Sequence, residues 1–145
     1  MGRHRMLATV AGALAVAGCG GGDDGPTQAE FVTQANAVCK EHRDKTSAAA
    51  AQLLAGGELP SPQDFGRLAQ ETIVPEYTAQ IAELRPLEPP ADSADEYRAW
   101  LADSEALRMR IEANPALIQD PTSAAEVNRQ ARALGLSGSC DVGPT

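Results

Sequence analysis

Four stretches with helical periodicity, separated by proline and glycine, most constrain what this chain of 145 residues can fold into. In each stretch apolar residues recur at three- and four-residue steps, the pattern of a helix with one buried face. No run alternates apolar and polar residues as a strand does, and no Asn-Gly hairpin turn occurs. Four such helices with short connections predict an all-α fold, an antiparallel up-and-down four-helix bundle. The stretches expected to form it are 28–55, 62–85, 94–113 and 121–134.

Residues that commonly cap helices lie at the predicted helix boundaries. Thr27 and Glu30 have the spacing of a capping box, in which each side chain accepts a hydrogen bond from the other residue's backbone N–H. Ser93 and Glu96 repeat that spacing. The predicted N-caps are Thr27, Ser61, Ser93 and Asp120, and the glycines predicted to follow helix ends are Gly56, Gly57 and Gly135. Pro62 and Pro121 follow two of these caps, where proline suits the first helical turn.

One proline lies inside a predicted helix. Pro75 interrupts the apolar stripe that runs from Phe65 to Leu84. Proline has no backbone N–H, and its ring clashes with the preceding turn. We therefore expect the second helix to be kinked or split at Pro75.

The first nineteen residues have the pattern of an export signal. A basic start, Arg3-His4-Arg5, precedes an apolar run over residues 6–17 that is too short to span a hydrocarbon core of about 30 Å. Val16-Ala17-Gly18-Cys19 resembles the lipobox of bacterial lipoproteins. In that family the signal is removed before the cysteine, which carries a thioether-linked diacylglycerol. The resemblance implies a signal peptide over residues 1–18 and lipid attachment at Cys19, which would anchor the protein to the outer face of the cytoplasmic membrane.

The same residues leave a second reading open. Ala15-Val16-Ala17 fits an ordinary cleavage site, and a cut after Ala17 would release a secreted, unanchored protein. The glycine-rich run that follows suits a flexible tether between a bilayer and a folded body. We assign residues 19–26 to the lipidated cysteine and tether, and residues 27–145 to one helical domain.

The cysteine count favours lipidation and predicts a disulfide. Three cysteines leave one over in an exported protein, and acylation of Cys19 would leave Cys39 and Cys140 to pair in an oxidising compartment. In an up-and-down bundle the end of the fourth helix lies near the start of the first. A tail leaving Gly135 can therefore fold back and bring Cys140 to Cys39.

Charge limits the partners that we expect. Without the signal, which holds Arg3 and Arg5, the chain has 10 basic and 20 acidic residues, a formal charge of −10. This balance argues against nucleic acid, which binds basic patches. The expected partners are the membrane, through the lipid at Cys19, and an unknown envelope protein or small ligand.

Several motifs in order resemble the small, largely uncharacterised helical lipoproteins of actinobacteria. Apart from the lipobox and tether, the matching motifs are Phe31-x3-Ala35-Asn36-x2-Cys39, Leu87-Glu88-Pro89-Pro90-Ala91-Asp92, Tyr97-x2-Trp100-Leu101 and Gly-Leu-x3-Cys ending at Cys140. Leu134 departs from the pattern, since an aromatic residue is expected near that position. The resemblance implies architecture and location, and it supplies no catalytic residues.

No residue pattern predicts catalysis, a cofactor or a metal. His42 is the one histidine of the mature chain, and a lone histidine on such a helix is typically half-buried or solvent-facing. Tyr77, Tyr97 and Trp100 can floor a ligand pocket between helices, or they can simply fill the core. We therefore expect a non-enzymatic binding or scaffolding module of the cell envelope, with a small-ligand-binding bundle as the alternative.

Overall fold

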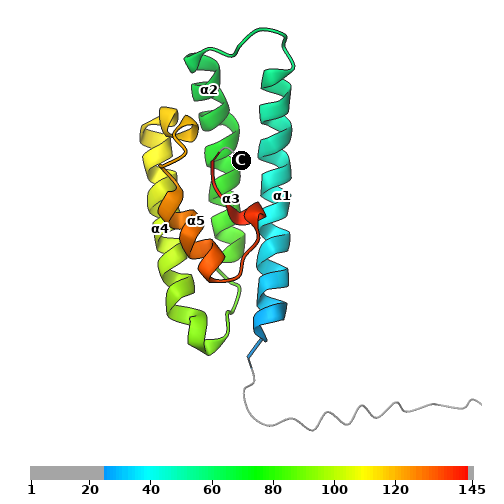
Figure 1. Ribbon diagram of the computed structural model, residues 1–145, viewed down its shortest axis with the longest axis vertical. Coiled ribbons are helices and arrows are strands. Elements are labelled where there is room, and N and C mark those ends of the chain that lie inside the picture. Colours follow the sequence, from blue (N-terminus) through cyan, green and yellow to red (C-terminus); the bar gives the residue numbers. More distant parts are fainter. Residues whose placement is uncertain (1–24, 144–145) are drawn as a thin grey trace, which may run out of the picture.

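The computed structural model describes residues 25–143 (Figure 1). The predicted signal peptide, the predicted lipid attachment at Cys19 and most of the predicted tether lie outside the described residues.

Helices account for all the regular structure in the described chain, and no strand occurs there. The α-helices are α1 Gln28–Leu54, α2 Pro62–Leu68, α3 Val74–Leu84, α4 Ala94–Ala113 and α5 Ala125–Ala133. Figure 1 shows α1 running up, α2 and α3 running down as one rod, α4 running up, and the short α5 descending obliquely across the front. The predicted all-α, antiparallel up-and-down bundle is confirmed, with α2 and α3 together forming its second helix.

The interruption predicted at Pro75 is also confirmed. A π-helical segment, Ala69–Ile73, joins α2 to α3, and Pro75 lies in the first turn of α3. Because proline cannot donate to the preceding turn and its ring clashes with it, the wider π turn gives the backbone room to pass this residue.

Two of the four predicted N-caps form as local sequence dictates. Thr27 N donates to Glu30 Oε2 at 2.9 Å, and Glu30 N donates to Thr27 Oγ1 at 3.3 Å. Ser61 makes the same reciprocal pair with Asp64, at 2.9 and 3.3 Å. Both caps satisfy backbone donors that the first helical turn leaves free.

The side chains of the other two predicted caps do not cap an α-helix, although Ser93 directly precedes α4 as predicted. Ser93 ends a 3₁₀ turn, Ala91–Ser93, and its hydroxyl donates to the carbonyl oxygen of Pro90 instead of capping α4. Ser93 occupies the N-cap position of α4, but its φ of −110° and ψ of 6° lack the extended geometry in which an N-cap side chain reaches the first turn. Asp120 accepts hydrogen bonds from Thr122 N and Oγ1 at 2.8 and 2.7 Å, so it caps a turn, and α5 begins only at Ala125.

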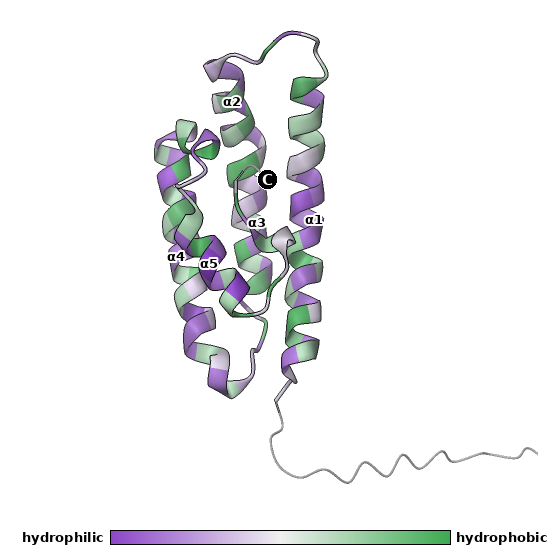
Figure 2. Cartoon of the chain, viewed as in Figure 1, coloured by the Kyte–Doolittle hydropathy of each residue, from purple (hydrophilic) through white to green (hydrophobic). Residues whose placement is uncertain are grey.

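The core is centred on three aromatic side chains in the lower half of the bundle. Phe31 packs edge-on against Tyr97 with ring centroids 4.9 Å apart, and Trp100 lies 5.7 Å from Tyr97. The Tyr97 hydroxyl donates to the carbonyl oxygen of Leu84 at 2.7 Å, which ties α4 to the end of α3. Figure 2 shows that each helix mixes hydrophilic and hydrophobic residues along its length, as expected where one face is buried.

The chain after α5, residues 135–143, is called the C-terminal tail here. Gly135 has φ +79°, and Leu136 N donates to Ala131 O while Gly135 N donates to Arg132 O, so a Schellman motif ends α5. The reversal carries a 3₁₀ turn, Gly138–Cys140, to the side of α1 (Figure 1). Cys39 and Cys140 form a disulfide with an S–S distance of 2.07 Å, which confirms the predicted pair.

Candidate ligand-binding site

A cavity of about 450 Å³ opens between the second half of α1, the α2–α3 rod and the C-terminal tail. On the remaining side the cavity is bounded by the end of α4 and by the 3₁₀ turn Pro115–Gln119, because α5 begins only at Ala125. The larger apolar side chains that line the cavity are Phe65, Leu68, Ile73, Ile111, Leu117, Ile118 and Val142. Most of them are only half-buried, so the cavity offers an apolar wall that the fold itself does not fill.

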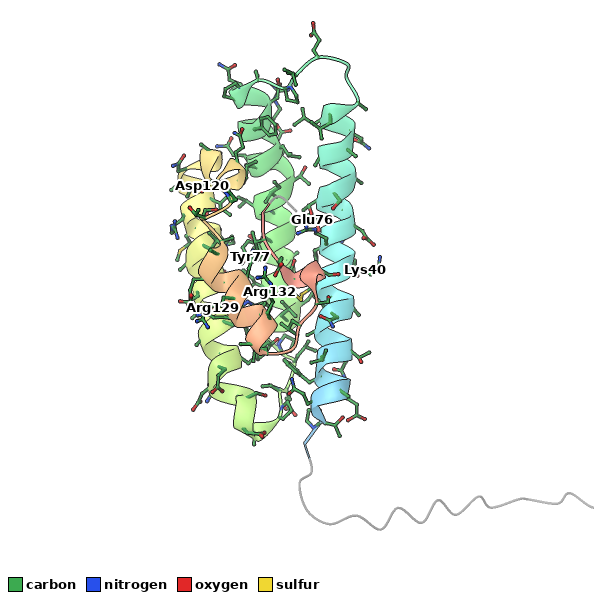
Figure 3. The ribbon with its side chains drawn as sticks, viewed as in Figure 1. Lys40, Glu76, Tyr77, Asp120, Arg129 and Arg132 are labelled. Carbon is green, nitrogen blue, oxygen red and sulfur yellow. A yellow bond between two sulfur atoms is a disulfide. The ribbon has the colours of Figure 1, made fainter. Side chains whose placement is uncertain are left out.

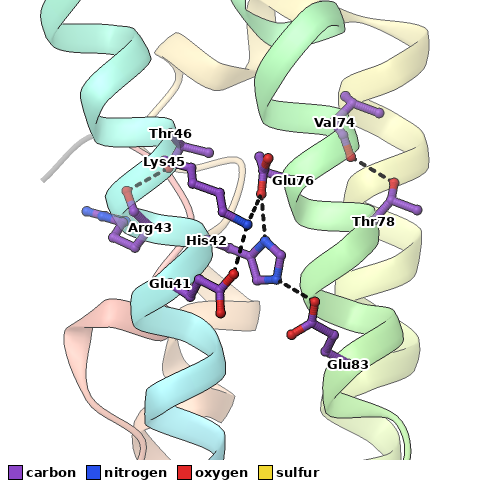
Figure 4. A network of polar contacts seen from close by, with 9 residues as sticks. All are labelled: Glu41, His42, Arg43, Lys45, Thr46, Val74, Glu76, Thr78 and Glu83. Atoms are coloured by element: carbon purple, nitrogen blue, oxygen red, sulfur yellow. Dashed lines mark hydrogen bonds and ion pairs between the residues drawn. The ribbon is translucent and has the colours of Figure 1, made fainter.

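A buried histidine lies at the polar side of the cavity (Figure 4). His42 is 2% exposed, and its Nδ1 lies 2.7 Å from Glu76 Oε2 while its Nε2 lies 3.4 Å from Glu83 Oε1. The expectation of a half-buried or solvent-facing histidine is therefore wrong. The reason is tertiary, because α3 places Glu76 within hydrogen-bond distance of Nδ1 and so compensates for part of the water that the imidazole loses, while Nε2 makes no hydrogen bond within residues 25–143.

Lysine extends this network to the surface. Lys45 Nζ lies 3.0 Å from Glu41 Oε1, one turn back on α1, and 3.5 Å from Glu76 Oε2 (Figure 4). The Lys45 hydrogen bond and charge lower the pKa of Glu41, and the Glu41 hydrogen bond raises the pKa of Lys45. Lys45 therefore stays cationic and offsets the charge of Glu76.

Tyr77 contributes an unpaired hydroxyl. The residue is 6% exposed, lines the cavity, and its Oη has no hydrogen-bond partner within residues 25–143. Burial raises the pKa of Tyr77, an effect that the nearby Ser104 hydroxyl partly opposes. The phenol is therefore neutral at the pH of a cell.

Four polar contacts fix the C-terminal tail as a wall of the cavity. Arg43 Nη1 donates to the backbone carbonyl of Asp141 at 2.6 Å, and Arg132 Nη2 donates to Asp141 Oδ2 at 2.7 Å. The Asn128 side chain donates to Val142 O at 2.9 Å and accepts from Val142 N at 2.8 Å. Figure 3 shows Arg132 on α5, on the side of the tail. The wall thus depends on both neighbouring helices, α1 and α5.

The three aromatic residues predicted to share a pocket do not all line the same one. Tyr77 lines the cavity, whereas Tyr97 lines a separate hollow of about 880 Å³ beside Leu87 and Leu101. Trp100 is 1% exposed and lines neither. The separation follows from helix register, since Tyr97 packs against Phe31 in the first turn of α1, while the cavity begins at His42.

Sequence reasoning missed Arg43, Glu76 and Asp141, because no local motif joins them. One signal was present for two of them. Arg43 lies four residues, about one helical turn, after Cys39, and Asp141 directly follows Cys140. A predicted Cys39–Cys140 bond therefore already places Asp141 beside the face of α1 that carries Arg43.

Two further structural findings concern the described part of the chain. Across residues 25–143, no three side chains of His, Cys, Asp and Glu converge closely enough to hold a metal ion. His42 illustrates why, since its two carboxylates face opposite edges of the ring. Within the same residues, no helix combines the length and the apolar character that crossing a membrane requires.

Comparison of the chain with protein-family models, with curated proteins and with solved structures gives no match.

Proposed function

We propose that the helical domain is a non-enzymatic module that binds a small, mainly apolar ligand in the cavity between α1, the α2–α3 rod and the C-terminal tail. The observation that carries this proposal is the cavity itself. Its volume of about 450 Å³ falls within the range of small-molecule sites, and its lining combines an apolar wall, which includes Phe65, Leu68 and Ile118, with polar and charged side chains. This observation favours ligand binding over scaffolding, the two alternatives that the sequence left open.

The state of the polar groups supports binding without catalysis. His42 is held between Glu76 and Glu83, and Glu76 also faces Lys45. Asp141 is held by Arg132. Because His42 is 2% exposed and both of its ring nitrogens face carboxylates of α3, neither nitrogen is open to a molecule in the cavity, and the network is suited to lining a ligand.

Filling the cavity provides the test. Ala50 lines the cavity, whereas its neighbour Ala51 is exposed and does not. The probe is the neutral fluorophore N-phenyl-1-naphthylamine, whose emission rises in an apolar site. We expect saturable binding by the wild-type protein, and an affinity loss of about tenfold or more, ~1.4 kcal/mol, in Ala50→Trp, because an indole would occupy the cavity.

Ala51→Trp is the matched control and should bind within about twofold of wild type, a difference well below ~1 kcal/mol. Far-UV circular dichroism and thermal unfolding show whether both variants fold alike. No saturable binding by the wild-type protein, or an equal loss in both variants, would refute the proposal.

We also propose that the protein is a lipoprotein, anchored through Cys19 to the outer face of the cytoplasmic membrane. The lipobox resemblance supports this, and so does the Cys39–Cys140 disulfide, since it accounts for the other two cysteines of the chain. Two acyl chains hold a protein stably at a membrane, whereas one gives only reversible binding.

Mass spectrometry of the mature N-terminal peptide tests the anchor. We expect the peptide to begin at Cys19 and to carry the mass of a diacylglyceryl group, with the protein in the membrane fraction. An unmodified peptide that begins at Gly18 would show instead that the signal is cut after Ala17 and that the protein is secreted.

A further inference from the structure

Some of the charged side chains that line the cavity lie beside a side chain of opposite charge, and one does not. Glu76 has His42 at 2.7 Å and Lys45 at 3.5 Å, and Asp141 has Arg132 at 2.7 Å. Each carboxylate that lines the cavity therefore already faces a basic side chain, and neither depends on a ligand for its counter-charge.

Arg43 is the exception among these lining residues. It is half-buried, and the one hydrogen bond of its guanidinium within the described residues runs from Nη1 to the backbone carbonyl of Asp141 at 2.6 Å. Among the ion pairs within residues 25–143, none includes Arg43. A carbonyl oxygen satisfies one N–H of the guanidinium but leaves its positive charge without a counter-ion.

The overall charge balance makes this exception informative. Arg3, Arg5, Asp23 and Asp24 lie outside residues 25–143, so the described chain holds 10 basic and 18 acidic residues. Five of the eight arginines in this part of the chain pair with a carboxylate, namely Arg67, Arg98, Arg108, Arg129 and Arg132. Of the three that do not, Arg85 and Arg110 are exposed to solvent, which compensates their charge, and Arg43 is half-buried. Arg43 instead lies beside an aliphatic wall, and no carboxylate within the described residues pairs with its charge.

From this arrangement we propose, resting on the ligand-binding function above, that the ligand is an amphiphile with one carboxylate, held by Arg43 while its apolar body lies against Phe65, Leu117 and Ile118. A guanidinium has five N–H donors in a planar fork that matches a carboxylate, and one bond to Asp141 leaves donors for such a pair. Ser47 also lines the cavity, one turn further along α1, and its hydroxyl can donate to the same head group.

The physical reason to favour a carboxylate is the gain from pairing two charges beside an apolar wall. Hydrogen bonds between ionised partners are roughly twice as strong as neutral ones. An alcohol of the same body keeps the apolar contact but leaves Arg43 uncompensated. An amine brings a second positive charge toward the guanidinium.

Three probes with one body and different head groups test the ligand class by titration calorimetry: 4-phenylbutanoate, 4-phenylbutanol and 4-phenylbutylamine. We expect 4-phenylbutanoate to bind about tenfold more tightly than 4-phenylbutanol, and 4-phenylbutylamine to bind most weakly. Carboxylate binding no tighter than alcohol or amine binding would overturn the carboxylate proposal and leave the cavity proposal standing. If none of the three probes binds, and the neutral fluorophore does not bind either, the cavity proposal itself fails.

Two charge-removing variants locate the contact. Arg43 lines the cavity, whereas Arg129 is exposed on α5, pairs with Glu126 one turn away and does not line it. We expect Arg43→Gln to reduce 4-phenylbutanoate affinity by about tenfold and 4-phenylbutanol affinity by less than about twofold. Arg129→Gln removes the same charge away from the cavity and should leave both affinities within about twofold.

The comparison between probes keeps the test valid if Arg43→Gln loosens the tail. A loosened tail would weaken acid and alcohol binding alike, whereas loss of a carboxylate contact changes the ratio of the two affinities. An unchanged ratio in Arg43→Gln, or an equal change in Arg129→Gln, would overturn the proposal.

Discussion

Replacement of Cys140 by alanine is expected to lower the free energy of unfolding by about 4 kcal/mol, because the disulfide closes a loop across 101 residues and so restricts the unfolded chain. For a domain of this size that loss corresponds to a fall in melting temperature of roughly 15 °C. The measurement is thermal and urea unfolding, followed by far-UV circular dichroism under oxidising conditions.

The double variant Cys39→Ala/Cys140→Ala is the matched control, because it removes the same bond without leaving Cys39 as a free thiol. Both variants, and the wild-type protein after reduction, should lose the same stability if closure of the loop is the cause. The hydrogen bonds from Arg43 and Asn128 to the C-terminal tail remain in all three. A fall of only a few degrees would mean that these contacts, and not the sulfur bridge, hold the tail.

Trp100→Ala is expected to cost about 3–5 kcal/mol, a large share of the stability of a typical domain. Trp100 is 1% exposed and packs beside Tyr97 in the aromatic centre that joins α1 and α4. Removal of the indole leaves a cavity that rigid neighbours fill only in part. The loss is measured by urea unfolding followed by far-UV circular dichroism. Tryptophan fluorescence cannot be used, because Trp100 is the one tryptophan of the chain.

Trp100→Phe separates packing from hydrogen bonding. The indole Nε1 has no hydrogen-bond partner among the described residues, so a phenyl ring gives up no polar contact there. We expect this variant to retain more than half of the stability that Trp100→Ala loses, because it keeps most of the packed volume. Equal losses in the two variants would show that the indole nitrogen contributes more than the structure indicates.

Much of the fold could be predicted because it depends on near neighbours along the chain. The capping boxes at Thr27 and Ser61 join residues three apart, and Pro75 disturbs the turn directly before it. Such effects act within one helical turn, so they can be read from a short window of sequence. The same windows failed at Ser93 and Asp120, where a preceding 3₁₀ turn and an Asp turn use the capping side chains before an α-helix begins.

The candidate site could be predicted only in part. Tyr77 was predicted as a pocket residue and lines the cavity, but Tyr97 and Trp100 belong to the aromatic centre at the other end of α1. Periodicity shows that a residue faces inward, and it does not show which neighbour lies opposite. Which neighbour lies opposite depends on the axial offset between the packed helices.

The sequence by itself determined the helices, their antiparallel order and the pairing of Cys39 with Cys140, because turn residues, periodicity and chain connectivity restrict these strongly. Only the tertiary structure decided that His42 is buried between Glu76 and Glu83 and that Arg43 lines a cavity without a carboxylate partner among the described residues. These outcomes depend on contacts across 34 to 98 residues of chain. The balance between losing water and gaining a partner at each group is set only once the helices have packed.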